Sequence, residues 1–300
     1  MTPPACGNAV RVEDVRVDSW NELNDVLSEG SWDAGIGRRR SRFAFRGTGD
    51  DSADLRTSLA RLGGSFADVE RNLTRNFRKY AERHAVRNDS MWSWLSLAQH
   101  HGLPTRLLDW TYSPLVAAHF ATANVERYDL DGAVWCLNFV QAHRHLPDTL
   151  RKRLESEGSE VFTVDMLDDA TDTLEEFDRL AEEPFVAFFE PPSFDERILS
   201  QWALFSVLSD PTAGFDAWLE RHPDVLARRV VIPADLKWEV RDRLDMAGVN
   251  ERTLFPGLDG LSRWLARYYA PRGDDGEPVP ADREPPEDGR ASRFHGLDPG

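Results

Sequence analysis

The pattern of apolar and polar positions along the chain predicts several amphipathic helices. Ser19 followed by Glu22 has the spacing of a helix capping box, and apolar residues then recur at helical period until Gly30. The same period continues from Phe66 to about Ala85. Further helices are expected at residues 91–101, 115–123, 234–246 and 257–269.

Short apolar runs predict the strands of a sheet. Residues 43–47 alternate in bulk, and Gly47-Thr48-Gly49-Asp50-Asp51 after them predicts a turn. Other runs typical of strands stand at residues 107–110, 133–139, 185–190, 204–208 and 228–232. Five or six short strands mixed with helices, without a strict βαβ alternation, predict an α+β fold.

Composition divides the chain into three parts. Residues 1–15 predict a flexible lead-in, and residues 16–270 predict one α+β domain. Residues 271–300 are rich in Pro, Gly, Asp and Glu, which predicts a disordered acidic tail. The apolar fraction of 41%, with 10 Trp and 16 Phe, is sufficient for a sizeable core.

Charge and hydropathy restrict the partners that we expect. A formal net charge of −16 argues against a protein whose main task is to neutralise nucleic-acid phosphates. No apolar run reaches the roughly 18 residues of a membrane helix, so no membrane partner is expected. The N-terminus lacks the pattern of a secretory signal, and Cys6 and Cys136 are the only cysteines. We therefore expect a cytoplasmic protein without a disulfide framework.

Two segments carry a resemblance to a known family. The first is Phe45-Arg46-Gly47. The second is Gln99-His100-His101-Gly102-Leu103-Pro104-Thr105-Arg106-Leu107-Leu108-Asp109-Trp110-Thr111, followed by Pro114, Ala117, Ala118, Phe120 and Ala121. Together with residues 197–201 and 253–260, these segments resemble the FRG domain family over residues 16–270. That family is named for a motif, so the resemblance leaves the activity open.

A second likeness, to the ADP-ribosyltransferases, implies a function. Those enzymes bind NAD with an arginine on a first core strand, a Ser/Thr element on a second and a glutamate on a later one. Arg46 with Gly47 resembles the first element, residues 107–111 the second, and Glu196 the third, although Gln201 competes with Glu196 for that position. The likeness implies a small split mixed or antiparallel sheet flanked by helices, with NAD as the substrate.

Each candidate residue has a chemical reason. The candidate catalytic residues are Arg46, His100, Asp109, Glu196 and Gln201. A guanidinium presents a rigid fork to phosphate, a carboxylate can stabilise an oxocarbenium-like state, and histidine titrates near neutral pH. Contacts to the nucleotide are expected from Arg46, Gly47, Thr105, Arg106, Trp110 and Thr111. No metal site is expected, because the adjacent histidines lack the spacing of a zinc-binding helix.

Structural roles compete with these functional interpretations. Arg46 can pair with a carboxylate at a strand end, and His100 can cover the last carbonyls of a helix. Arg106 and Asp109 can form buried ion pairs. Among the tryptophans at 92, 94, 110, 135 and 202, most are expected in the core, and only Trp110 is a stacking candidate.

Three hypotheses about function follow. The first is an NAD-consuming enzyme that transfers ADP-ribose to a macromolecular acceptor or hydrolyses NAD, in bacterial stress or phage defence. The second is a non-catalytic module that binds a nucleotide or another small ligand as a sensor, which is expected if Gln201 holds the third position. The third is a metal-assisted phosphodiesterase that uses His100 or His101 with Asp109.

Overall fold

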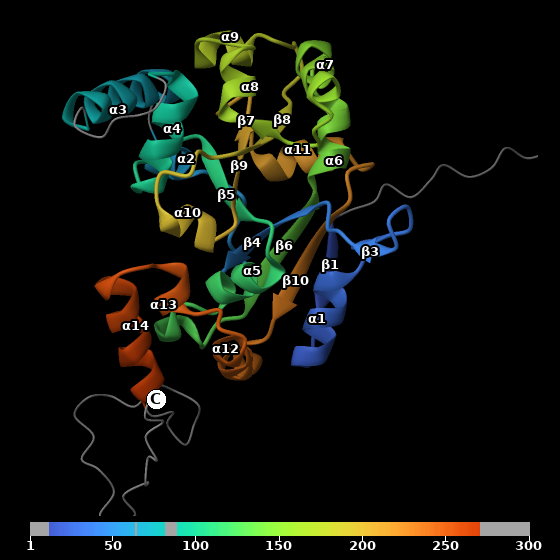
Figure 1. The fold of residues 1–300 in the computed structure, drawn as a ribbon, viewed down its shortest axis with the longest axis vertical. Coiled ribbons are helices and arrows are strands. Elements are labelled where there is room, and N and C mark those ends of the chain that lie inside the picture. The colour runs from blue at the N-terminus through green and yellow to red at the C-terminus, as the bar shows by residue number, and fades with distance from the viewer. Residues whose placement is uncertain (1–11, 64, 82–88, 271–300) are drawn as a thin grey trace, which may run out of the picture.

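The chain folds around one mixed β-sheet (Figure 1). The computed structural model describes residues 12–63, 65–81 and 89–270. Eight strands lie in the order β1-β10-β6-β4-β5-β9-β8-β7, and β2 and β3 form a separate hairpin. The strands are β1 (Glu13–Arg16), β2 (Trp32–Asp33), β3 (Arg38–Arg39), β4 (Phe43–Thr48), β5 (Leu107–Thr111), β6 (Gly132–Asn138), β7 (Phe162–Thr163), β8 (Val186–Glu190), β9 (Ala203–Leu208) and β10 (Ala227–Ile232). Within the sheet, only the edge pairs β1–β10 and β7–β8 are parallel.

Helices pack on both faces of this sheet. The α-helices are α1 (Trp20–Ser28), α2 (Ser58–Leu62), α3 (Phe66–Tyr80), α4 (Met91–His100), α5 (Pro114–Ala121), α6 (Phe139–Ala142), α7 (Asp148–Glu157), α8 (Val164–Asp168), α9 (Leu174–Asp178), α10 (Glu196–Ser200), α11 (Phe215–Arg221), α12 (Lys237–Met246), α13 (Glu251–Leu254) and α14 (Leu258–Tyr269). Short 3₁₀ helices lie at η1 (Val125–Arg127), η2 (His143–His145) and η3 (Ala234–Leu236). None of the helices in the described ranges is both long and apolar enough to cross a membrane.

The buried side chains show that the two faces of the sheet are packed differently. Side chains alternate between the two faces along a strand, so the side chains of consecutive residues lie on opposite faces of the sheet. One cluster spans a whole face and includes Ala44, Leu108 and Leu204. The opposite face carries two clusters, one over β10, β6 and β4 and the other over β5, β9 and β8. The core on that face is therefore interrupted at the boundary between β4 and β5.

The structure confirms the α+β class and most of the predicted elements. Ser19 caps α1 and Ser90 caps α4 through side-chain hydrogen bonds, as the spacing of these residues indicates. The prediction of a small sheet is wrong, because the sheet has eight strands. The predicted lead-in extends into β1, and its first eleven residues, like the predicted tail, lie outside the described residues. Strand β1 has no apolar alternation of its own and is positioned by pairing with β10.

Gly47 is required for close packing and does not form a turn. It lies inside β4, so the turn predicted to begin there starts only after Thr48. A Cβ atom on Gly47 would lie 1.9 Å from the carbonyl oxygen of Ala117, where α5 crosses the strand. Ala117, Ala118 and Ala121 are fully buried, so this helix packs through its small residues.

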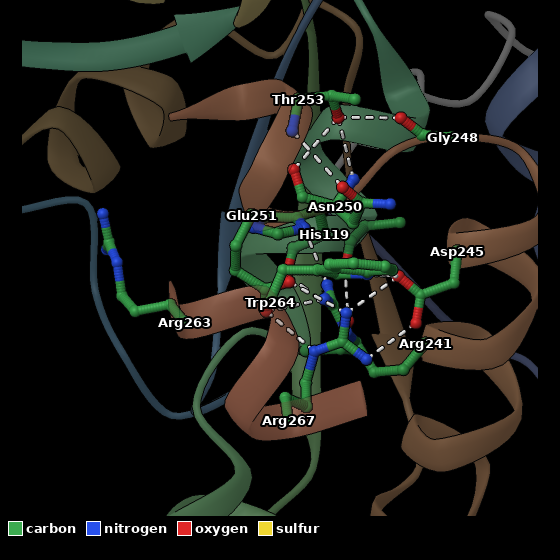
Figure 2. A network of polar contacts seen from close by, with 12 residues as sticks. His119, Arg241, Asp245, Gly248, Asn250, Glu251, Thr253, Arg263, Trp264 and Arg267 are labelled. Carbon is green, nitrogen blue, oxygen red and sulfur yellow. Dashed lines mark hydrogen bonds and ion pairs between the residues drawn. The ribbon is translucent and has the colours of Figure 1, made fainter. Parts of the chain in front are cut away.

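A buried network of charges fastens the C-terminal helices to one another and to α5 (Figure 2). Arg267 pairs with both Asp245 and Glu251 at 2.7–2.8 Å, and Arg241 pairs with Glu251 at 2.8 Å. Burial and the charge of Arg241 lower the pKa of His119 to about 3, so this neutral side chain accepts a hydrogen bond from Arg241 at 2.7 Å. The network links α14 to its neighbours through polar contacts, since Gly260 is the single buried residue of that helix. Helix α12 in addition packs against α5 through Val240 and Leu244.

Replacing Gly47 with alanine tests the strand–helix contact. The new methyl group would overlap backbone atoms that have no space to move, so we expect a loss of about 3 kcal/mol in the free energy of unfolding. Gly49→Ala is the matched control, because nothing lies within 4 Å of the position that a Cβ atom would take there. Urea denaturation of both variants measures the difference. Equal stability of the two variants would show that α5 can move away from β4.

Replacing Glu251 with glutamine tests the buried network. Burial alone would raise the pKa of Glu251, but hydrogen bonds from Arg267 and the charge of Arg241 lower it to about 2. A carboxylate with a lowered pKa stabilises the fold above its ordinary pKa near 4.5, and this contribution is lost as the pH falls towards 2. We expect Glu251→Gln to cost about 3 kcal/mol at pH 7, because two arginines lose their shared partner.

The same pair of proteins predicts a pH dependence. The difference in free energy of unfolding between wild type and Glu251→Gln should shrink as the pH is lowered from about 5 to about 2. Glu239→Gln is the control, since its ion pair with Arg243 on α12 is exposed and contributes little. A constant difference across this pH range, measured by urea denaturation, would contradict the assignment of Glu251.

Candidate functional site

A cleft of about 650 Å³ lies where β4 and β5 diverge. These two strands share a single residue pair, Phe45 opposite Thr111, whereas β4 pairs with β6 along its whole length. Residues of β4, β5, β9, α10 and the end of α4 line the cleft, so it lies at the interruption between the two clusters of the divided face. Its volume is in the range of sites for small molecules and cofactors.

Arg46 occupies the gap between the diverging strands. Its Nη1 donates to the carbonyl oxygen of Asp109 at 2.6 Å. In a regular sheet this carbonyl oxygen would accept a hydrogen bond from a backbone N–H group of the neighbouring strand. Its Nε is buried and has no hydrogen-bond partner. Burial lowers the pKa of Arg46, although the charge of Asp109 opposes this shift. Arg46 thus places a partly desolvated cation at the cleft.

Asp109 is held by a chain of hydrogen bonds. The backbone N–H of Leu107 donates to Thr105 Oγ1 at 3.1 Å, and this hydroxyl donates to Gln99 Oε1 at 2.5 Å. The amide nitrogen of Gln99 then donates to Asp109 Oδ2 at 2.8 Å. The direction of each bond determines the next, so Gln99 must present its N–H group to Asp109. The carboxylate of Asp109 remains exposed to the cleft in a defined orientation.

His100 joins two walls of the cleft. Its Nε2 lies 2.7 Å from Asp195 Oδ2, and its side chain is only 8% exposed. Asp195 also caps α10 by accepting hydrogen bonds from the backbone N–H groups of Arg197 and Ile198. His100 therefore lines the cleft but uses one ring nitrogen to fasten α10 to α4, a tertiary contact that was not expected from the sequence.

Of the two candidates for the third position, Gln201 lines the cleft and Glu196 does not. Glu196 is the first residue of α10 and points to solvent. Gln201 follows that helix, and its side-chain nitrogen donates to the carbonyl oxygen of Leu254 at 3.0 Å. Thr111 Oγ1 in turn donates to the carbonyl oxygen of Gln201 at 2.7 Å. Arg46, Asp109 and Gln201 are brought together, whereas Glu196 lies outside.

Arg106 and Thr105 have structural positions. The guanidinium of Arg106 is buried and pairs with Glu70 and Asp178, at 2.6 Å each. Arg106 thus lies outside the cleft and forms a buried ion pair, with other partners than Asp109. Thr105 is buried too and acts on the cleft only through Gln99.

Trp92, Trp94 and Trp135 are buried in the core as expected, whereas Trp110 and Trp202 differ from the expectation. The backbone position of Trp110 borders the cleft, but its indole is buried in the core on the opposite face, packs near Phe188 and donates to Ser206 Oγ at 2.8 Å. Trp110 is therefore no stacking platform. Trp202 is 63% exposed and is the one non-glycine residue with a positive φ, +50°, in the described ranges. A bulky residue in this conformation carries backbone strain, which often marks functional regions.

Two residues of the cleft were missed in the sequence. Gln99 belongs to the motif that carries the family resemblance, but its role depends on Asp109 lying beside it in space. Arg197 lies in the later segment of the resemblance, where only Glu196 and Gln201 were considered as site residues. Within the described ranges, no group of three or more His, Cys, Asp or Glu side chains is placed to hold a metal ion.

Comparison with known proteins identifies one domain. The family model of the FRG domain matches residues 41–130, from the start of β4 to just beyond η1. No curated protein and no solved structure matches the chain. The matched segment contains Arg46, Gln99, His100 and Asp109, whereas Arg197 and Gln201 come from outside it. The chain therefore contains an FRG domain, and the candidate cleft lies between this matched segment and the later elements α10 and β9.

Proposed function

We propose that the cleft binds NAD and cleaves the bond between its nicotinamide and ribose, as an ADP-ribosyltransferase-like enzyme does. One observation carries this proposal: Arg46 and Asp109 converge from two diverging strands in one cleft large enough for a nucleotide. The guanidinium supplies donors for phosphate or ribose oxygens. The carboxylate supplies the negative charge that an oxocarbenium-like transition state requires.

In this mechanism Asp109 takes the role that the sequence resemblance gave to Glu196. Its carboxylate accepts the ribose 2′-hydroxyl and faces the carbon from which nicotinamide departs. Gln99 keeps the carboxylate oriented, so little reorganisation is needed when positive charge develops on the ribose. Water or a macromolecular acceptor then attacks that carbon, which gives hydrolysis or transfer of ADP-ribose. A setting in bacterial stress or phage defence remains part of the proposal.

A second candidate function has support from Gln201. Because this neutral residue, and not a glutamate, lies at the cleft beside β9, the cleft fits a module that binds the nucleotide without turning it over. In that case ligand binding itself is the signal. The two functions share the same ligand and differ in whether product is formed.

Incubation of the protein with NAD, with free nicotinamide as the readout, separates these functions. We expect release by wild type and a loss of about 100-fold or more in Asp109→Asn, which keeps the shape of the side chain but removes its charge. Glu196→Gln is the matched control, and we expect it to retain activity within about twofold, since Glu196 lies outside the cleft.

A parallel thermal-shift titration with NAD reports binding without turnover. A rise in Tm with no nicotinamide formed, with and without cell extract as a source of acceptor, would favour the binding module. Nicotinamide release that survives in Asp109→Asn and is lost in Glu196→Gln would reverse the assignment of the two carboxylates. Neither binding nor release would overturn both functions.

A further inference from the structure

Arg197 and Arg46 are the two arginines that line the cleft, and neither forms an ion pair within the described residues. The other arginines with largely buried side chains are paired: Arg106 with Glu70 and Asp178, Arg241 with Glu251, and Arg267 with Asp245 and Glu251. Charges removed from water are normally compensated in this way. The Nε atoms of Arg46 and Arg197 are buried without a hydrogen-bond partner, as is that of Arg241, so the missing ion pair is what distinguishes the two cleft arginines.

Two contacts hold Arg197 in place, one with Phe255 outside the cleft and one with the backbone of His100 at the cleft wall. Its guanidinium lies over the ring of Phe255, 5.1 Å from the centroid, and Nη1 donates to the carbonyl oxygen of His100 at 3.5 Å. Arg263 stacks over the same ring at 4.4 Å but does not line the cleft. In Figure 2 its side chain extends away from the buried network. A stacked guanidinium loses less freedom on binding, so Arg197 is preorganised for an anion.

The charge balance of the cleft favours a negatively charged ligand. Its lining contains two arginines and one carboxylate, Asp109, which is already hydrogen-bonded by Gln99. Asp195, which is close to the cleft, is engaged by His100 and by the first turn of α10. This local excess of positive charge occurs in a chain with a formal net charge of −16. A local cationic site on an acidic protein favours a small anionic ligand that fits the cleft. The net negative charge of the chain disfavours large polyanions such as nucleic acids.

We propose that Arg46 and Arg197 together hold a pyrophosphate group, one guanidinium from each wall of the cleft. The ligand class is a nucleoside diphosphate, either free or as half of a dinucleotide. This inference assigns the residues that bind the phosphates of the ligand. It rests on the proposed function for the identity of the nucleotide. Each guanidinium can make two parallel hydrogen bonds to one phosphate, and such charge-assisted pairs are stronger than neutral ones. Two guanidinium groups therefore favour the binding of a ligand with two phosphates over a ligand with one.

Isothermal titration of the full chain with ADP and with AMP tests the clamp. We expect wild type to bind ADP about 10-fold or more tightly than AMP, because the second phosphate adds charge-assisted hydrogen bonds. Arg197→Ala should lower the affinity for ADP by about 10-fold or more and leave AMP nearly unchanged, so that the preference disappears. Arg197→Lys should recover only part of it, since lysine lacks the planar fork.

Arg263→Ala is the matched control, because it removes the same charge and a stacking contact to the same ring outside the cleft. It should leave both affinities within about twofold of wild type. The proposal is overturned if wild type binds ADP no better than AMP, if it binds neither, or if Arg263→Ala and Arg197→Ala weaken ADP equally.

The titration with ADP and AMP tests the pyrophosphate site independently of the nicotinamide assay. ADP has no nicotinamide, so ADP binding that depends on Arg197, without cleavage of NAD, would retain the clamp and reject the enzyme. Cleavage of NAD with a KM that Arg197→Ala does not change would retain the enzyme and reject the clamp.

Discussion

The divergence of β4 from β5 is the constraint on which the rest of the structure depends. Beyond the pair of Phe45 and Thr111 the two strands no longer form a ladder, so backbone groups along both edges need other partners. A side chain supplies one of these partners, because Arg46 donates to the carbonyl oxygen of Asp109 on β5. Arg46, which bridges this gap, also lines the cleft.

The FRG motif is the run Phe45-Arg46-Gly47, and each of its residues has a different structural role at the divergence of β4 from β5. Phe45 packs into the core beneath α5, and Arg46 fills the gap between the strands. Gly47 allows α5 to lie directly on β4, since any side chain there would meet the carbonyl oxygen of Ala117. One apolar, one charged and one minimal side chain therefore stand in succession where β4 leaves β5 and passes under a helix.

Local patterns in the sequence were sufficient for most elements and insufficient for the site. Ser19 and Ser90 act through hydrogen bonds to residues three positions later, so their effect can be predicted from spacing alone. Strand β1 is polar and depends on β10, more than two hundred residues away, which no local pattern reveals. Arg106 finds Glu70 and Asp178 in distant helices, and these partners withdraw it from the cleft.

The same distinction explains the carboxylates and the tryptophans. Whether Glu196 or Gln201 faces the cleft depends on where the five-residue helix α10 ends, and helix ends are difficult to predict to one residue. Trp110 lies in an alternating strand, but the face to which its indole points is decided by the whole sheet. Trp202 is exposed because its backbone turns at a positive φ, which a sequence pattern does not predict for tryptophan.

The interrupted core has a thermodynamic consequence. Two apolar clusters on one face, separated at the split, leave the halves of the sheet joined by the continuous cluster on the other face and by few backbone bonds between β4 and β5. A molecule bound in the cleft would contact both halves at once and would act as a removable cross-link between them. Its binding free energy would then stabilise the contact between the two halves of the sheet. Binding at the cleft would therefore make the whole domain unfold more cooperatively.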